Sequence, residues 1–295
     1  MNRPIRVLLQ TTIPSSDDDW HIGRFSLLRD FLAGETDKSG SPMFEVTARD
    51  RDEVGRPDQV LSALDTSKFD ELWLFAVDTG NGLTGADCQA ISRFRRRGGG
   101  LFVTRDHMDL GCSVCTLEGV GLAHYFHSKN REPDPSRQSA DDTGSPSILW
   151  PNYHSGANGD FQHIDASEPL HPVMADPDAP GGAIQFFPAH PHEGAVGQPE
   201  HEASARVVAK GHSKLSGRAF NLVVAFEASS HGGPAIAQST FHHFADYNWD
   251  PSLGAPSFVT DVPGDGMAHS LEARRSIRQY VRNVALWLAR RPINN

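Results

Sequence analysis

The chain has 295 residues and a formal net charge of −10, with 37 acidic against 27 basic residues. Hydrophobic residues make up 38% of it, which is typical of a soluble globular protein and excludes a disordered one. The acidic balance argues against a nucleic-acid partner, and no apolar stretch is long enough to cross a membrane. Three cysteines cannot form a disulfide framework. Residues 1–20 lack the apolar run of a signal peptide, so we expect a cytoplasmic protein.

The first 105 residues alternate between two kinds of pattern. Short apolar runs at 5–10, 44–48, 71–77 and 101–104 predict strands, and the segments between them predict helices at 21–33, 59–64 and 84–97. Strands alternating with helices indicate a parallel sheet with helices on both faces. Ligands of such sheets bind beyond the carboxyl ends of the strands. The segments 17–21 and 105–107 lie at that rim.

The rest of the chain is less regular. Residues 128–182 are rich in Pro, Gly, Ser and Asp, and we interpret them as a loop-rich insertion within a single domain of residues 1–295. Strand-like runs return at 184–187, 205–209, 220–226 and 235–241, which predicts additional strands. Residues 270–291 have the periodicity of a long amphipathic helix.

Four motifs follow one another along the chain: a His soon after the first strand, a Gly triplet and strand ending in Asp-His, a central His-Pro, and a strand running into two His. They are His21, Gly98 to His107, His171-Pro172 and Ser239 to Phe244. In this order they resemble the class I glutamine amidotransferase-like superfamily, and within it the trehalose-utilisation (ThuA-like) branch.

This resemblance implies a flavodoxin-like α/β sheet and a carbohydrate-like or polyhydroxylated substrate. It does not extend to the reaction of the amidotransferases. Those enzymes carry a Gly-x-Cys-x-Gly elbow, whereas this strand runs into Arg105, Asp106 and His107 with no Cys at the turn. Glutaminase chemistry by that route is therefore not expected.

Candidate catalytic residues lie where two predicted strands end. Asp106 and His107 follow the fourth strand, and His242 and His243 end a later one. Carboxylates and imidazoles serve as acids, bases or metal ligands. Since neighbours along a strand point to opposite faces, only one of the paired His faces a given pocket. The alternative interpretation is that these side chains cap turns or bond to backbone carbonyls.

A metal site is the second hypothesis for this rim. His21, His107 and His242 would be the ligands of a divalent ion, with zinc as the metal that such imidazoles favour, and Asp106 would bind or orient them. The alternative for His21 is an ordinary residue in the first turn of a helix. No phosphate-binding glycine motif follows a strand, so we expect no nucleotide cofactor.

The expected substrate-binding residues come from the rim, from the segment 150–160 and from the turn after the paired His. They are Asp19, His21, Arg105, Tyr153, His154, Asp246, Asn248 and Trp249. The segment 150–160 is interpreted either as a loop that covers the pocket or as a self-contained loop. The pattern His190-Pro191-His192-Glu193 favours a solvated loop over a metal site.

Cys112 and Cys115 form a CxxC pair, with His124 and His127 expected on the same helix. Such a pair is a redox dithiol, half of a zinc site, a nucleophile with its base, or two buried inert thiols. The last interpretation is favoured.

These observations favour a small-molecule hydrolase or isomerase that uses His and Asp acid–base or metal-assisted chemistry. Two alternatives stay open: a catalytically silent module that binds a ligand or partner, and a cysteine-dependent amidase or redox protein using Cys112 or Cys115. The expected partner is a small-molecule substrate, with no nucleic acid or membrane, and a homo-oligomer is compatible with the sequence.

Overall fold

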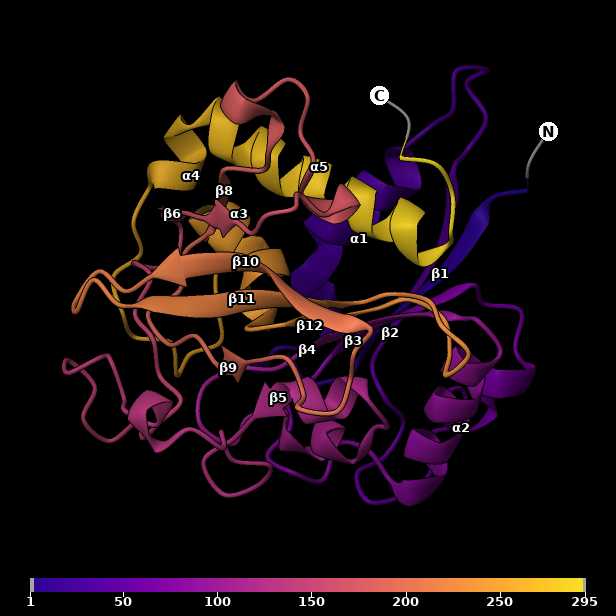
Figure 1. Cartoon of the computed structure of the whole chain (residues 1–295), viewed down its shortest axis with the longest axis horizontal. Helices are drawn as coiled ribbons and strands as arrows, with labels where there is room; N and C mark the ends of the chain where they lie inside the picture. Colours follow the sequence, from indigo (N-terminus) through magenta and orange to yellow (C-terminus); the bar gives the residue numbers. More distant parts are fainter. Residues whose placement is uncertain (1–2, 294–295) are drawn as a thin grey trace.

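An eight-stranded sheet runs through the centre of the molecule (Figure 1), in a computed structural model that describes residues 3–293. Its strand order is β2-β1-β3-β4-β12-β11-β10-β7. The first five pair in parallel: β2 (Phe44–Arg49), β1 (Ile5–Thr11), β3 (Glu71–Phe75), β4 (Gly100–Thr104) and β12 (Ala235–Gln238). The last three add antiparallel pairs: β11 (Ala219–Phe226), β10 (Ala205–His212) and β7 (Asp165–Ala166). The predicted α/β class, with a mostly parallel sheet and added strands, is confirmed.

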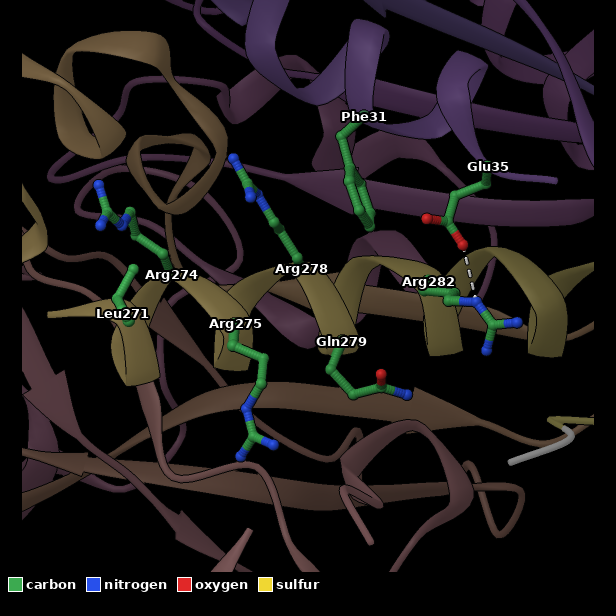
Figure 2. Close-up of a pocket in the computed structure, with 8 residues that line it drawn as sticks. All are labelled: Phe31, Glu35, Leu271, Arg274, Arg275, Arg278, Gln279 and Arg282. Atoms are coloured by element: carbon green, nitrogen blue, oxygen red, sulfur yellow. Dashed lines mark hydrogen bonds and ion pairs between the residues drawn. The ribbon is translucent and has the colours of Figure 1, made fainter. Parts of the chain in front are cut away.

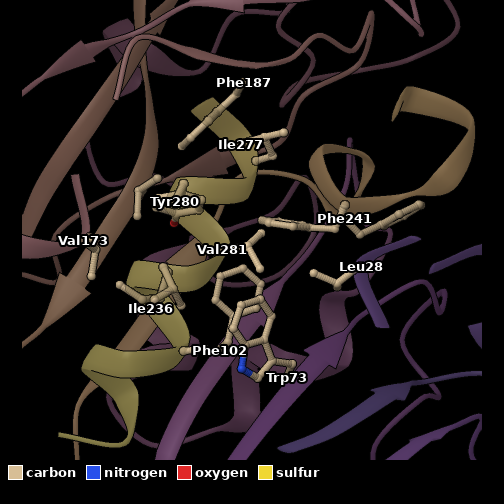
Figure 3. Packing of buried hydrophobic residues seen from close by; sticks show 14 of the residues in the cluster. Leu28, Trp73, Phe102, Val173, Phe187, Ile236, Phe241, Ile277, Tyr280 and Val281 are labelled. Atoms are coloured by element: carbon tan, nitrogen blue, oxygen red, sulfur yellow. The ribbon is translucent and has the colours of Figure 1, made fainter. Parts of the chain in front are cut away.

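Helices cover both faces of this sheet. Neighbouring residues of β3 enter different cores, because side chains alternate across a strand. Trp73 packs with α1 (Ser26–Gly34) and α5 (Leu271–Leu288), whereas Leu72 packs with α2 (Gly85–Arg96). Figure 3 shows the first core, where Trp73 stacks on Phe102 with ring centroids 4.4 Å apart, beside Tyr280 of α5. The continuously apolar run of β3 therefore reflects burial on two sides.

Smaller elements complete the chain. Two short antiparallel pairs lie outside the main sheet: β5 (His124–Tyr125) with β9 (Ala195–Val196), and β6 (Phe161–His163) with β8 (Phe186–Pro188). The helices α3 (Asp246–Trp249) and α4 (Gly266–His269) each make a single turn. Within the described residues, no helix is both long enough and apolar enough to cross a bilayer.

Two predicted elements differ from the structure. The strand expected over 235–241 ends at Gln238, because the hydroxyl of Thr240 accepts the backbone N–H of His242 and starts a 3₁₀ turn, η8 (Phe241–Phe244). The helix expected to carry Cys115, His124 and His127 is instead two 3₁₀ turns, η3 (Cys112–Thr116) and η4 (Val120–Ala123), followed by β5. Gly119 separates the turns at φ +65°, which is outside the helical region.

The adjacency of β4 and β12 positions the candidate site. These strands are parallel neighbours, with Thr104 paired to Gln238 at their carboxyl ends. The segments that follow them, residues 105–107 and 239–243, therefore leave the sheet side by side. Two of the predicted strand-end motifs meet at one edge for this reason.

Candidate metal centre

A carboxylate and two imidazoles meet beyond this edge. Asp106, His190 and His242 each offer one potential ligand atom, and these atoms all lie within 4.8 Å of one another. His190 Nε2 is 3.6 Å from Asp106 Oδ1, and His242 Nε2 is 3.6 Å from Asp106 Oδ2. All three side chains are at most 5% exposed. In the described part of the chain, no other group of three such ligands forms.

The three side chains come from three distant segments. Asp106 follows β4, and the Thr240 hydroxyl donates to its Oδ1 at 3.2 Å. His242 lies in η8 after β12. His190 follows β8 and is held by Ser155, whose backbone N–H donates to the His190 carbonyl and whose hydroxyl accepts the His190 N–H. Hydroxyl and backbone contacts thus hold Asp106 and His190 in place.

Hydrogen bonds to two asparagines determine the tautomers of both imidazoles. The carbonyl of Ala189 can only accept, so the Asn248 atom 2.9 Å away is its amide nitrogen. That nitrogen also donates to Asn158 Oδ1 at 2.8 Å, and Asn248 Oδ1 therefore faces His242 Nδ1 at 3.2 Å. Asn158 Oδ1 in turn lies 2.8 Å from His190 Nδ1. Each ring is then a donor at Nδ1, and in its neutral form it has the lone pair of Nε2 on the side of Asp106.

This arrangement concentrates electron pairs in a buried space. Burial, with His242 nearby, holds the pKa of His190 well below its usual range, so this imidazole is neutral at neutral pH. Burial would raise the pKa of Asp106, but the positive charges that His107 and His242 carry when they are protonated outweigh it and hold that pKa below its usual range. His190 Nε2 has no hydrogen-bond partner. An ionised carboxylate beside unprotonated nitrogens is the donor set that a divalent cation requires.

Two further histidines surround Asp106 nearer the surface. His107 Nε2 is 3.7 Å from Asp106 Oδ2, and its side chain, 21% exposed, is the most open of the cluster. Its Nδ1 is buried without a partner. His192 Nδ1 lies 3.0 Å from Asn152 Oδ1 and 3.3 Å from Asp142 Oδ2. Burial lowers the pKa of both His107 and His192, so each offers a lone pair at neutral pH.

The second of the paired histidines, His243, faces away from this cluster. The Tyr280 hydroxyl donates to Gln238 Oε1, so the Gln238 amide nitrogen donates to His243 Nδ1, both at 2.8 Å. His243 therefore carries its proton on Nε2, 3.3 Å from Glu193 Oε2. We predicted that His242 and His243 point to opposite sides because the strand continues through both. They do diverge, but a 3₁₀ turn, η8, separates the two rings.

The structure does not bring His21 into the metal group. Its Nδ1 accepts the Gly23 backbone N–H at 3.2 Å and caps a 3₁₀ turn over Ile22–Phe25. Asp19 accepts the Trp20 backbone N–H, and it is Trp20 that reaches the site, edge-on to the His242 ring with centroids 4.7 Å apart. The assembled group therefore differs from the predicted set of His21, His107 and His242 in two members.

The residues expected after the paired histidines have structural contacts. Asp246 accepts hydrogen bonds from the backbone and hydroxyl of Ser26 and from the Leu27 backbone N–H, at the start of α1. Asn248 orients His242 as described, and the Trp249 indole donates to the His243 carbonyl at 2.8 Å. Asn248 is the one of these residues that acts directly on the metal group.

The remaining predicted substrate-binding residues have contacts of other kinds. The Arg105 guanidinium is fully buried 4.2 Å from the centre of the Phe126 ring, and it donates to the Met108 carbonyl. The Tyr153 ring stacks on Phe220, with centroids 4.9 Å apart. His154 is partly buried beside Tyr153, and its carbonyl accepts the Lys214 N–H.

His190 and His192 were expected in a solvated loop, and that interpretation is wrong. His190 is 4% exposed, and Glu193 is fully buried, where it accepts the Ser155 and Ser239 hydroxyls. The segment is polar, and distant segments bury it, so its local sequence does not indicate burial. One signal was present: the pattern follows the apolar run 184–187, as the other histidine motifs follow strands.

The cysteines lie apart from this cluster. Cys88, Cys112 and Cys115 are free thiols, and the first two are buried. Burial raises the pKa of all three, which lowers the thiolate fraction at neutral pH. These properties match the favoured interpretation of inert core thiols.

No protein-family model and no curated protein matches this chain. Among solved structures, a ThuA-like protein from Bacteroides uniformis is 11% identical, with 94% of this chain and 93% of that one covered and a TM-score of 0.43. The glutaminase domain of Trypanosoma brucei CTPS is 13% identical over 98% and 96% of the two chains, with a TM-score of 0.47. A carbohydrate deacetylase is 11% identical over 80% of this chain and 29% of that one, with a TM-score of 0.40. These similarities concern the fold.

Proposed function

We propose that this chain binds a divalent metal ion, zinc by the type of donor, through Asp106, His190 and His242, and that it is a metal-dependent hydrolase. The observation that carries the proposal is the hydrogen-bond chain from Ala189 through Asn248 and Asn158. It directs two unprotonated Nε2 atoms at one carboxylate. His190 Nε2 and His242 Nε2 each lie 3.6 Å from one of the two Asp106 oxygens, close to the ~3.3 Å that separates ligands on a tetrahedral zinc with bonds of about 2.0–2.1 Å. One donor atom from each residue lies within 4.8 Å of the others.

The residues around the three ligands support hydrolysis. With three protein ligands, a divalent ion keeps a position for water and acts as a Lewis acid. His107 is neutral, partly exposed and 3.7 Å from Asp106, so it can accept the proton of an attacking water. The rings of His190 and His242 are stacked with centroids 3.5 Å apart, and both would tilt so that their lone pairs point at one ion.

The substrate class rests on the sequence resemblance alone. The ThuA-like motifs imply a small carbohydrate-like or polyhydroxylated molecule, and we retain that class for the proposed substrate. An isomerase would use the same acid–base groups on such a molecule, but a site for activated water favours hydrolysis.

Metal titration of chelator-stripped protein tests the metal site. We expect about one equivalent of zinc to bind the wild type, and His190→Ala and His242→Ala to lose more than about 100-fold in affinity, beyond the 10–100-fold typical of outer hydrogen-bond partners. His21→Ala is the matched control, because His21 belongs to the predicted set but caps a turn in the structure. Equal zinc affinity in the wild type and His190→Ala would exclude this site.

The near-complete burial of the ligands favours one competing function, a binding module in which His107 closes the coordination as a fourth ligand. The variant His107→Ala distinguishes a hydrolase from a binding module. For a hydrolase, zinc affinity holds and turnover of acylated or glycosylated test substrates falls by about 10²–10⁴-fold. For a closed site, zinc affinity itself falls and the wild type turns over none of these substrates.

A further inference from the structure

A groove with an unusual charge lies between α1 and α5, built from residues outside the metal group (Figure 2). Its volume is about 500 Å³. Four arginines of α5 line it, and Phe31 of α1 reaches toward Arg278, whereas Arg275 extends from the other side of α5 (Figure 2). The arginines are Arg274, Arg275, Arg278 and Arg282. They stand out in a chain whose net charge is −10.

Only two of these arginines are neutralised. Arg282 Nε lies 2.8 Å from Glu35 Oε2, and Arg275 Nη2 lies 3.4 Å from Asp176 Oδ2. Within residues 3–293, no ion pair joins Arg274 or Arg278 to a carboxylate, although acidic residues exceed basic ones by ten. Two guanidinium groups therefore remain without a counter-charge in the same groove.

The spacing of the arginines adds to this imbalance. Arg274, Arg278 and Arg282 follow one another at four-residue intervals on one face of α5, and the unpaired Arg274 and Arg278 repel each other. The guanidinium carbon of Arg278 is 5.9 Å from the centre of the Phe31 ring, which holds this cation over the groove. Repulsion of this kind is relieved when an anion binds between the guanidinium groups.

The geometry points to a binding site for a small phosphate monoester in this groove. A planar guanidinium offers paired N–H donors that match the oxygens of a phosphate, and a phosphate monoester carries a charge of about −2 at neutral pH, equal to the two unpaired arginines. Phe31 and the exposed Leu271 offer apolar surface to the organic part of the ligand.

Calorimetric titration of metal-free protein at low salt tests this site, with inorganic phosphate and phenyl phosphate as probes. Removing the metal prevents phosphate from binding at the other centre. We expect phenyl phosphate to bind more tightly than inorganic phosphate, because its ring covers apolar surface. Arg278→Gln should weaken binding of both by about tenfold, and the double variant Arg274→Gln/Arg278→Gln should weaken it further.

Arg29→Gln is the matched control, because it removes the same charge from an arginine of α1 that already pairs with Asp30 at 2.7 Å. Its affinity for both probes should equal that of the wild type, and His190→Ala should also bind normally. Without phosphate, the double variant should melt no lower than the wild type, which shows that it folds. The inference is overturned if neither probe binds at millimolar concentration, or if Arg29→Gln weakens binding as much as Arg278→Gln.

Discussion

At the scale of single residues, Asn248 has the widest influence on the metal group. Its amide nitrogen is committed to two oxygens, on Ala189 and Asn158, so its own oxygen must accept from His242. A buried side chain with every donor and acceptor paired has one orientation only. Asn248 therefore decides which nitrogen of His242 carries the proton, and through Asn158 it decides the same for His190.

Replacing Asn248 tests whether it orients the two imidazoles or only fills space in the core. We expect Asn248→Ala to lower zinc affinity by about 10–100-fold, because both imidazoles lose the partner that fixes their tautomer. It should also cost about 1–3 kcal/mol of stability, because buried groups lose their partners. Asn283→Ala is the control: this buried side chain donates to the Val173 and Ala175 carbonyls, away from the metal group. If both variants lose stability but keep wild-type zinc affinity, Asn248 has no orienting role.

His124 gives the protein a defined sensitivity to acid. Its ring is fully buried, neither nitrogen has a partner, and burial lowers its pKa from 6.5 to about 3. Between pH 6.5 and about 3, His124 therefore binds a proton in the unfolded chain but not in the folded chain. Stability from this residue is present above pH 6.5 and is lost as the pH falls, at about 1.4 kcal/mol per unit.

Urea unfolding of the wild type and His124→Phe at several pH values measures this effect. The variant should lose less stability than the wild type between pH 6.5 and about 3, because Phe binds no proton. A constant difference between the two proteins across this range would contradict the expected titration.

At the scale of elements, one carboxylate joins two helices that are far apart in sequence. Asp246 begins α3, and it accepts three hydrogen bonds from Ser26 and Leu27 at the start of α1. A carboxylate at a helix N-terminus satisfies free N–H groups and complements the helix dipole. The same contact anchors the segment that follows η8, directly after the ligand His242.

We expect Asp246→Ala to lower the free energy of unfolding by about 1–2 kcal/mol, the usual cost of removing a helix cap. Asp246→Asn should recover part of this loss, because its amide oxygen still accepts. Chemical denaturation measures both values. Both variants should still bind one zinc ion. If a variant loses the ion but stays folded, Asp246 itself binds the metal, contrary to this prediction.

At the scale of the whole molecule, the metal group joins segments from across the chain. Asp106, His190 and His242 come together from the turn after β4, from the segment after β8 and from η8. An ion that binds only the folded chain stabilises it by mass action, by about 2.7 kcal/mol at 100 times the dissociation constant. Zinc should therefore raise the melting temperature of the wild type, a chelator should reverse the rise, and His190→Ala should show neither. Calorimetric melting curves with and without zinc decide this.

Patterns within short stretches of sequence were enough to predict the secondary structure. Apolar periodicity and turn residues depend on neighbours within a few positions, so they identified the strands of the parallel sheet, the helix α5, and the strand ends that carry Asp106, His107 and His242. The resemblance in its motifs also placed the candidate site at the carboxyl edge of the sheet.

The packing of distant segments determines which imidazoles meet. The turn at η8 directs His242 to Asp106 and His243 to Glu193, a choice that depends on one hydroxyl, that of Thr240. His190 comes from a segment with no periodic signal, and its burial is imposed by residues more than thirty positions away, such as Asn158. Contacts between distant segments depend on how the chain packs rather than on local propensity, and for that reason the ligand set could not be obtained from the pattern of residues.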